Sequence, residues 1–263
     1  MADFILAPVR IEDTAAIVDL VRDSFDEERA PFLAYARPGM AAHLAIAVRY
    51  PGATPDRVLV AARDADDGRL LGFADFRVLE DGVGFLSYVA VSADARGKGI
   101  ATALIHDFLD TRPRITTLKL DVFRDNEPAR RLYARMGFVL EATGAWATRP
   151  IPRGHGDLRV SGLPNSLAVY DAYGFCELDV ELAGGPTTVG ILGPSVLNAR
   201  SLPNFLNDKL LAGLAEMFPD LTTAFVAVPE SALPDITVRH RLEGLSDRLS
   251  LAVPGHTPRG SAS

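Results

Sequence analysis

The stretch that decides the fold reads Val89-Ala90-Val91-Ser92-Ala93-Asp94-Ala95-Arg96-Gly97-Lys98-Gly99-Ile100-Ala101-Thr102-Ala103-Leu104. The chain is mostly apolar from position 85 to 91, which predicts a strand covered on both faces. The glycine-rich turn 96–99 interrupts this run, and apolar residues then recur at helical spacing from Ile100. A glycine turn that enters a helix N-terminus aims several backbone N–H groups in one direction, where the helix dipole adds partial positive charge. The stretch therefore predicts a binding site for a phosphate or pyrophosphate group.

Two common nucleotide-binding motifs do not match this turn. The P-loop pattern G-x-x-x-x-G-K-[ST] is absent from it. The dinucleotide pattern G-x-G-x-x-G also fails, because Thr102 stands where a third glycine would follow Gly97 and Gly99. A strand, a glycine turn and a helix can also serve packing alone, so the turn by itself leaves a purely structural role open.

The composition is that of an ordinary globular protein, with 263 residues, 48% of them hydrophobic and 23% charged. The net charge of −7, without a basic cluster, argues against nucleic acid as a partner. The single cysteine, Cys176, excludes an intramolecular disulfide and a cysteine-rich metal cluster, and we expect no metal. Acidic residues near the start and the lack of a long apolar run predict a cytoplasmic protein without a membrane span.

Hydrophobic patterns over residues 1–147 predict the element order β-α-α-β-β-β-α-β-α-β. The strands 57–63, 70–79 and 83–91 follow one another across turn residues, which predicts an antiparallel meander. A helix over 99–111 then leads to a strand, so the strands before and after this helix are expected to be parallel.

The next helix has clear signals at both ends. Asn126 is its predicted cap, and Pro128 suits its first turn. Gly137 is expected to end it, before another strand begins at Phe138.

Two separated motifs carry a resemblance to a known family. Arg96-Gly97-Lys98-Gly99-Ile100-Ala101 fits [QR]-x-x-G-x-[GA], and residues 126–138, Asn-Glu-Pro-Ala-Arg-Arg-Leu-Tyr-Ala-Arg-Met-Gly-Phe, fit N-x-x-A-x-x-x-Y-x-x-x-G-F. In this order, and after a strand that ends in Val-Ala-Val, they resemble the GNAT superfamily of acyl-CoA-dependent N-acetyltransferases. The resemblance covers residues 1–147. It implies an α/β fold with a mixed, V-splayed sheet and flanking helices, and with acetyl-CoA in the split.

The same resemblance implies the cofactor contacts. The pantetheine arm would pair with the backbone of Val89 and Val91, Asn126 would reach that arm, and Tyr133 would face the sulfur. The pyrophosphate would lie on the backbone N–H groups of Arg96, Gly97, Lys98, Gly99, Ile100 and Ala101.

The implied chemistry is the attack of a neutral amine on the thioester. By resemblance, the N–H of Val91 would stabilise the oxyanion, and Tyr133 would protonate the leaving thiolate. We take Glu80 as the candidate general base, while a chain of waters or an amine that is already deprotonated stays open. The other candidates on or near the central strands and loops are Asp81, Ser87, Tyr88, Asp75 and Glu28. His43 and His106 lie in helical stretches and are interpreted as structural.

The remaining residues have a different pattern. We expect a proline- and glycine-rich linker over 148–156, a smaller accessory α/β domain over 157–253, and a flexible tail over 254–263. Asn165 and the run Tyr173-Gly174-Phe175 faintly resemble the second motif, so a degenerate GNAT-like second unit is left open. We predict that a fragment ending near Thr148 still binds acetyl-CoA.

The sequence thus favours an enzyme that moves an acetyl group from acetyl-CoA to a primary amine by direct attack in a ternary complex. The alternative is a non-catalytic acyl-CoA-binding or regulatory module, and thioester hydrolysis is a lesser rival. Small-molecule amines and protein amino groups are both left open as acceptors, as is a homodimer.

Overall fold

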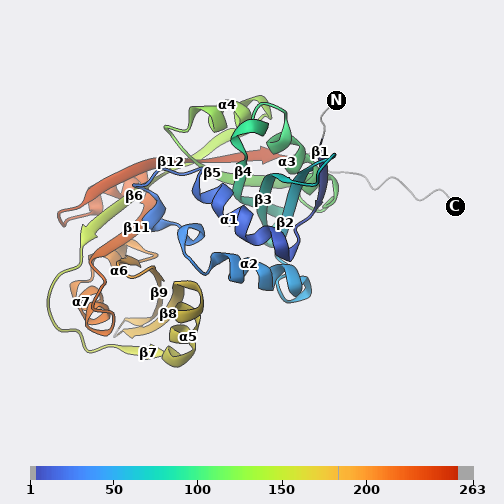
Figure 1. Ribbon diagram of the computed structural model, residues 1–263. Helices are drawn as coiled ribbons and strands as arrows, with labels where there is room; N and C mark the ends of the chain where they lie inside the picture. The colour runs from blue at the N-terminus through green and yellow to red at the C-terminus, as the bar shows by residue number, and fades with distance from the viewer. Residues whose placement is uncertain (1–3, 183, 254–263) are drawn as a thin grey trace. The chain divides into compact units, whose positions relative to one another are not determined.

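The computed structural model describes residues 4–182 and 184–253, so the predicted tail 254–263 lies outside the described residues (Figure 1). The chain divides into two compact units. The first holds residues up to 24, residues 41–142 and those from 247 onward, and the second holds 25–40 and 143–246. The sequence predicted one boundary, between residues 147 and 157. In the structure, residues 25–40 group instead with the second unit, and residues from 247 onward group with the first. Whether residues 1–147 fold alone stays a prediction.

The first unit has the expected order of elements. Its strands are β1 (Phe4–Pro8), β2 (Arg57–Asp64), β3 (Leu70–Val78), β4 (Val83–Val91) and β5 (Thr117–Phe123). Its helices are α1 (Thr14–Arg22), α2 (Met40–Arg49, from Ala41 onward), α3 (Ile100–Asp110) and α4 (Glu127–Arg135). Two long strands, β6 (Val139–Pro150) and β12 (Arg241–Ala252), contribute residues to both units.

The strands of the first unit lie in the order β1-β2-β3-β4-β5-β12. Strand β3 pairs antiparallel with both β2 and β4, which confirms the predicted meander. Strand β4 pairs parallel with β5 on its other side, as expected for two strands joined by the crossover helix α3. The mixed sheet with flanking helices confirms the predicted fold class.

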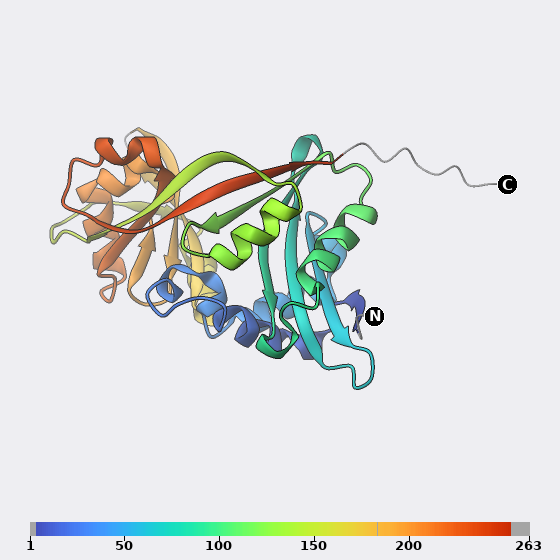
Figure 2. The same cartoon turned by 90° about the horizontal axis from the view of Figure 1, so that it is seen from above.

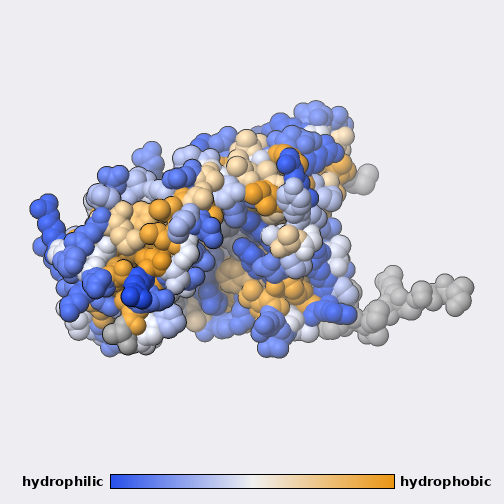
Figure 3. Space-filling view, turned by 90° about the horizontal axis from the view of Figure 1, so that it is seen from below, coloured by the Kyte–Doolittle hydropathy of each residue, from blue (hydrophilic) through white to orange (hydrophobic). Residues whose placement is uncertain are grey.

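Helices cover both faces of this sheet, α3 and α4 on one and α1 and α2 on the other (Figures 1 and 2). The face under α3 carries the main apolar cluster, in which the rings of Phe76 and Phe108 stack at 4.0 Å between centroids. On the other side, apolar residues gather over α2 at the surface, where Ile46 is 45% exposed (Figure 3). Alternating side chains of β2, β3 and β4 therefore point either towards α3 or towards the face of α1 and α2.

The second unit is also α/β. Its further elements are β7 (Arg159–Ser161), α5 (Leu163–Tyr173), β8 (Phe175–Leu182), β9 (Gly185–Leu192), β10 (Val196–Asn198), α6 (Leu202–Leu206), α7 (Asp208–Met217) and β11 (Thr223–Pro229). They build the strand order β6-β11-β10-β9-β8-β7 around their own apolar cluster. The apolar spacing of residues 202–218 predicts a single helix, but the structure has two, α6 and α7. The break occurs because Asn207 leaves helical geometry and its side chain caps α7 at the N–H of Leu210.

Candidate functional site

The central strand β4 carries an irregularity that the sequence did not reveal. Asp75 of β3 pairs with Tyr88, but the next residue, Phe76, pairs with Leu86, so Ser87 is an extra residue on β4. Such a β-bulge bends the strand and increases its local twist. The pairing of β4 with β5 covers only Val83–Leu86 and ends at this bulge. In the part of the chain that the structure describes, the residues of β4 after the bulge do not pair with β5. The second half of β4 is therefore separated from β5.

The separated half of β4 presents its backbone to the gap. Ser92 donates its N–H to the carbonyl of Leu71 at 2.8 Å, so Ser92 faces β3. Because hydrogen bonding alternates along a strand, the backbone groups of Val91 and Val89 face the other way, towards the side of β5. Both valines are partly exposed, although their side chains pack against the α3 cluster. The two residues predicted to pair with pantetheine therefore have the orientation that this pairing needs.

The turn after β4 has the expected backbone geometry. Gly97 and Gly99 have φ values of 79° and 81°, the left-handed region that favours glycine. Gly99 precedes the first residue of α3, Ile100, whose side chain is buried. Arg96 and Lys98 are exposed, and Arg96 Nε donates to the carbonyl of Val91 at 3.3 Å. The turn thus presents backbone N–H groups at the N-terminus of an 11-residue helix.

Helix α4 places the second motif as expected. Asn126 Oδ1 accepts the N–H of Ala129 at 3.2 Å, which confirms Asn126 as the helix cap. Its contact with pantetheine stays a prediction. Gly137 has a φ of 89° just after the helix, as a C-terminal glycine should.

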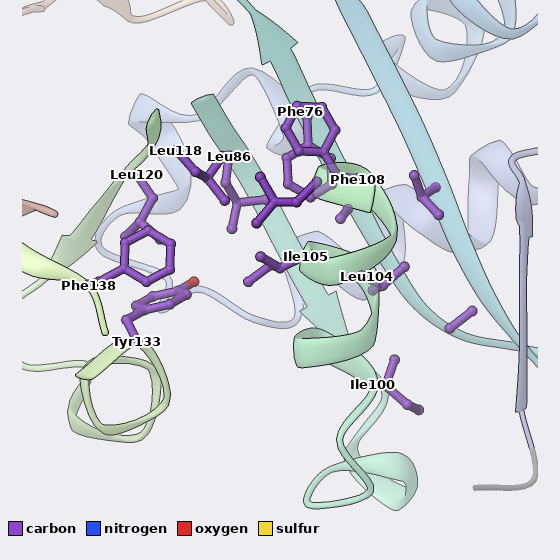
Figure 4. Packing of buried hydrophobic residues seen from close by; sticks show 14 of the residues in the cluster. Phe76, Leu86, Ile100, Leu104, Ile105, Phe108, Leu118, Leu120, Tyr133 and Phe138 are labelled. Atoms are coloured by element: carbon purple, nitrogen blue, oxygen red, sulfur yellow. The ribbon is translucent and has the colours of Figure 1, made fainter. Parts of the chain in front are cut away.

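Tyr133 lies inside the α3 cluster, with 5% of its surface exposed. Its ring packs edge-on against Phe138 at 5.5 Å, and its hydroxyl is directed away from Phe138 towards α3 (Figure 4). Burial raises the pKa of Tyr133 to about 12, since the low-dielectric surroundings disfavour the phenolate. The phenol is therefore protonated at neutral pH and can donate a proton.

The structure does not bring Glu80 to these groups. Glu80 is exposed in the short 3-10 turn Glu80–Gly82, before the first residue of β4. Val91 ends that strand eight residues after Val83, a separation of roughly 26 Å at about 3.3 Å per residue. Its role as the base stays a prediction. Two of the weaker candidates, Asp75 and Tyr88, lie instead directly beside the bulge.

A buried ion pair lies behind the bulge. Arg57 of β2 donates from Nη2 and Nε to the two carboxylate oxygens of Asp75 at 2.7 and 3.2 Å. Their side chains are only 6% and 3% exposed. The available signal in the sequence was the charged Asp75 between Ala74 and Phe76, inside the apolar run of β3. The partnership of Asp75 with Arg57 depends on the register of β2 against β3, which the sequence does not give.

The described residues contain no group of three or more His, Cys, Asp or Glu side chains that could hold a metal ion. Among the described residues, none of the helices is both long and apolar enough to cross a membrane.

Comparison with known proteins identifies residues 17–138, most of which belong to the first unit. A model of the acetyltransferase (GNAT) family matches residues 17–138. This part of the chain is a GNAT domain. The matched residues include β4, the glycine turn, α3 and α4, which form the geometry described above. No curated protein matches the chain.

Solved structures resemble the chain over both units. A tandem GNAT protein from the clavulanic acid biosynthesis pathway shares 17% identity at a TM-score of 0.64, covering 95% of this chain and 98% of that one. A GCN5-related N-acetyltransferase from Sphaerobacter thermophilus shares 14% identity at a TM-score of 0.62, covering 97% and 98%. At this identity the likeness concerns the fold alone. The chain therefore resembles a tandem GNAT protein in fold over both units, and the GNAT family supports acetyl transfer in general.

Proposed function

We propose that the protein is an N-acetyltransferase that moves an acetyl group from acetyl-CoA to a primary amine by direct attack in a ternary complex. The observation that carries this proposal is the separation of β4 from β5 beyond Leu86, directly before a glycine turn and a helix N-terminus. The pyrophosphate would lie on the backbone N–H groups of 96–101, whose geometry suits an anion. The pantetheine arm would run along Val91 and Val89 as an added strand.

The reaction needs three groups besides the cofactor contacts. The amine nitrogen attacks the carbonyl carbon, and a backbone N–H of β4 would donate to the oxygen that becomes negative. Val91 is the donor that the resemblance implied, but an arm that pairs with Val91 and Val89 brings this oxygen nearer to the bulge than to Val91. The C–S bond then breaks, and Tyr133 would give its proton to the departing thiolate. The proton that the amine loses passes to a base or to water. Because burial holds the pKa of Tyr133 at about 12, its proton is present throughout the neutral range.

The proposal is tested by measuring thermal unfolding with and without acetyl-CoA. A ligand at 100 times its Kd adds about 2.7 kcal/mol to the free energy of unfolding, which raises Tm by several degrees. NAD at the same concentration is the control, because the turn lacks the dinucleotide pattern. If acetyl-CoA gives no shift, both the enzyme and the acyl-CoA-binding module are excluded.

A second measurement separates these two functions. An N-acetyltransferase releases CoA from acetyl-CoA only when an amine is added, so a panel of small amines and peptides is screened for CoA release. Release without an amine indicates thioester hydrolysis. Binding of acetyl-CoA without release under any condition favours the non-catalytic module.

A further inference from the structure

A polar cluster lies at the bulge on the face of the sheet opposite to α3. In β2 and β3, Val58, Ala74 and Phe76 point into the α3 cluster, so Arg57 and Asp75 point to the face of α1 and α2. Leu86 and Val89 of β4 also belong to the α3 side, and the extra residue Ser87 leaves Tyr88 on the opposite face. Tyr88 and Asp75 are direct partners in the β3–β4 register, which brings their side chains together.

Tyr88 occupies the place where β4 and β5 separate. Their pairing ends at Leu86, two residues before Tyr88, and Tyr88 is partly exposed although its neighbours Asp75 and Arg57 are buried. An arm that runs from the glycine turn along Val91 and Val89 has its reactive end directed towards this point. Tyr88 therefore stands beside the reactive end, on the face away from the α3 cluster that holds Tyr133.

The charges around Tyr88 are balanced. Asp75 is neutralised by the two hydrogen bonds of Arg57. Burial first, and then Asp75, raise the pKa of Tyr88 to about 12, so its phenol is neutral. On α2, burial and the charges of Arg57 and Arg77 lower the pKa of His43, which keeps the imidazole neutral at pH 7. A partly buried site without net charge favours a neutral amine over an ammonium ion.

We propose that the hydroxyl of Tyr88 accepts a hydrogen bond from the N–H of the acceptor amine, with Asp75 as the residue that positions this hydroxyl. This inference rests on the proposed function. A phenol oxygen has two lone pairs, so it can accept from the amine beside any bond that its own proton makes. The bond fixes the amine so that the nitrogen lone pair is directed at the thioester carbon, which is the near-attack geometry that speeds the reaction. No proton is transferred in this step.

Two CoA derivatives test the contact without knowledge of the natural acceptor. CoA alkylated on sulfur with an N-methylacetamide group carries an N–H where the acceptor nitrogen would lie. CoA alkylated with a 2-oxobutyl group has a CH2 at that position and is otherwise of the same shape. Calorimetric titration of the wild-type protein should give about tenfold tighter binding of the amide, the effect of one hydrogen bond in a partly buried site.

Tyr88→Phe removes only the hydroxyl and should abolish this preference, bringing the two Kd values within about twofold while the ketone binds as before. Tyr50→Phe, at an exposed tyrosine that follows α2, should keep the preference. Asp75→Asn should reduce the preference without changing the Kd of the ketone, which a merely structural role would not do. If this variant unfolds because Arg57 loses its partner, Tyr88→Phe decides alone.

Each outcome supports or overturns the contact between Tyr88 and the acceptor amine. A preference that survives in Tyr88→Phe, or a wild-type protein without any preference, overturns the role of Tyr88 but not the proposed function. If neither derivative binds the wild-type protein, the proposed function itself fails and the inference falls with it.

Discussion

The two units contain the same crossover in two versions. In the first, β4 is antiparallel to β3, and α3 leads to the parallel strand β5. In the second, β10 is antiparallel to β9, and α6 with α7 leads to the parallel strand β11. Strand β4 has nine residues, of which only Val83–Leu86 pair with β5. All three residues of β10 pair with β11, and Ala199 extends the contact by donating its N–H to the carbonyl of Phe225 at 2.8 Å.

The turns that follow these two strands also differ. Where the first unit has glycines at positive φ, the second has Arg200 at φ 64°, whose guanidinium is bonded to Glu177 at 2.5 Å. Ser201 caps the five-residue helix α6 with its own hydroxyl at the N–H of Asn204. The backbone donors of the second turn therefore serve the fold itself. Under the proposed function, the difference indicates that a crossover binds acetyl-CoA only when its strands separate and its glycine turn is uncovered.

The largest expected effect concerns helix α4. Tyr133→Phe should lower turnover by about 10²–10⁴-fold, because the thiolate loses its proton donor, while the Kd of acetyl-CoA stays the same. The control is Tyr173→Phe at the end of α5, where the sequence of the second unit faintly resembles the motif. This variant should leave turnover unchanged. Steady-state CoA release with the amine found by the screen measures both. An unchanged rate in Tyr133→Phe would exclude it as the acid.

The glycine turn is expected to give the next largest effect. Gly97→Val places a branched side chain over the backbone donors and should weaken acetyl-CoA binding by about a hundredfold, the loss of one or two hydrogen bonds to a charged group. Gly97 has open space around its Cα, so folding suffers mainly from the strained φ. Arg200→Gly in the second turn is the matched control and should leave binding unchanged. Equal losses in both variants would contradict the comparison.

The next prediction concerns the number of acetyl-CoA molecules that bind to one chain. Calorimetric titration should find one acetyl-CoA per chain, because the second crossover has neither a separated strand nor a free turn. Two sites per chain would show that the second unit opens in solution. Repeating the titration with Gly97→Val then shows whether a second site remains.

The smallest effect is on stability at alkaline pH. The pKa of about 12 for buried Tyr133 exceeds its unfolded value near ~10, so its contribution to the free energy of unfolding is complete below pH ~10. That contribution is lost as the pH rises towards 12, which destabilises the first unit. Tyr133→Phe should move the loss of far-UV ellipticity to higher pH. Emission of Trp146, the single tryptophan, reports on the second unit and should be less affected. Identical transitions in wild type and variant would contradict this reasoning.

Local signals explain why the sequence predicted so much of the first unit. Several of its strands and helices begin or end beside Pro8, Gly99, Asn126 or Gly137, and α3 has a clear apolar period. The second unit gave weaker signals: α5 has no fully buried residue, and β10 is too short for a period. The bulge at Ser87 and the Arg57–Asp75 pair could not be predicted, because both depend on how distant strands align.

The residues near Asn165 that faintly resemble the second motif lie at a different place in the topology from α4. They fall on α5, which leads into the antiparallel hairpin of β8 and β9, whereas α4 follows a parallel crossover. Structural comparison finds a tandem GNAT protein with a similar fold over both units, and a degenerate GNAT-like second unit stays a prediction.

Strand β12 can join the sheet of the first unit only late in synthesis, because it lies far along the chain from its neighbour β5. Its last residues belong to the first unit, where Arg248 is bonded to Asp121 at 2.7 and 2.8 Å and Leu249 enters the α3 cluster. A ribosome must therefore release all residues up to those of β12 before β5 obtains this neighbour. A fragment ending near Thr148 would leave β5 as an open edge, the kind of strand that aggregates. We therefore expect the fragment to need a peptide of residues 241–253, added separately, to become a stable monomer, and its predicted binding of acetyl-CoA is to be measured with this peptide present.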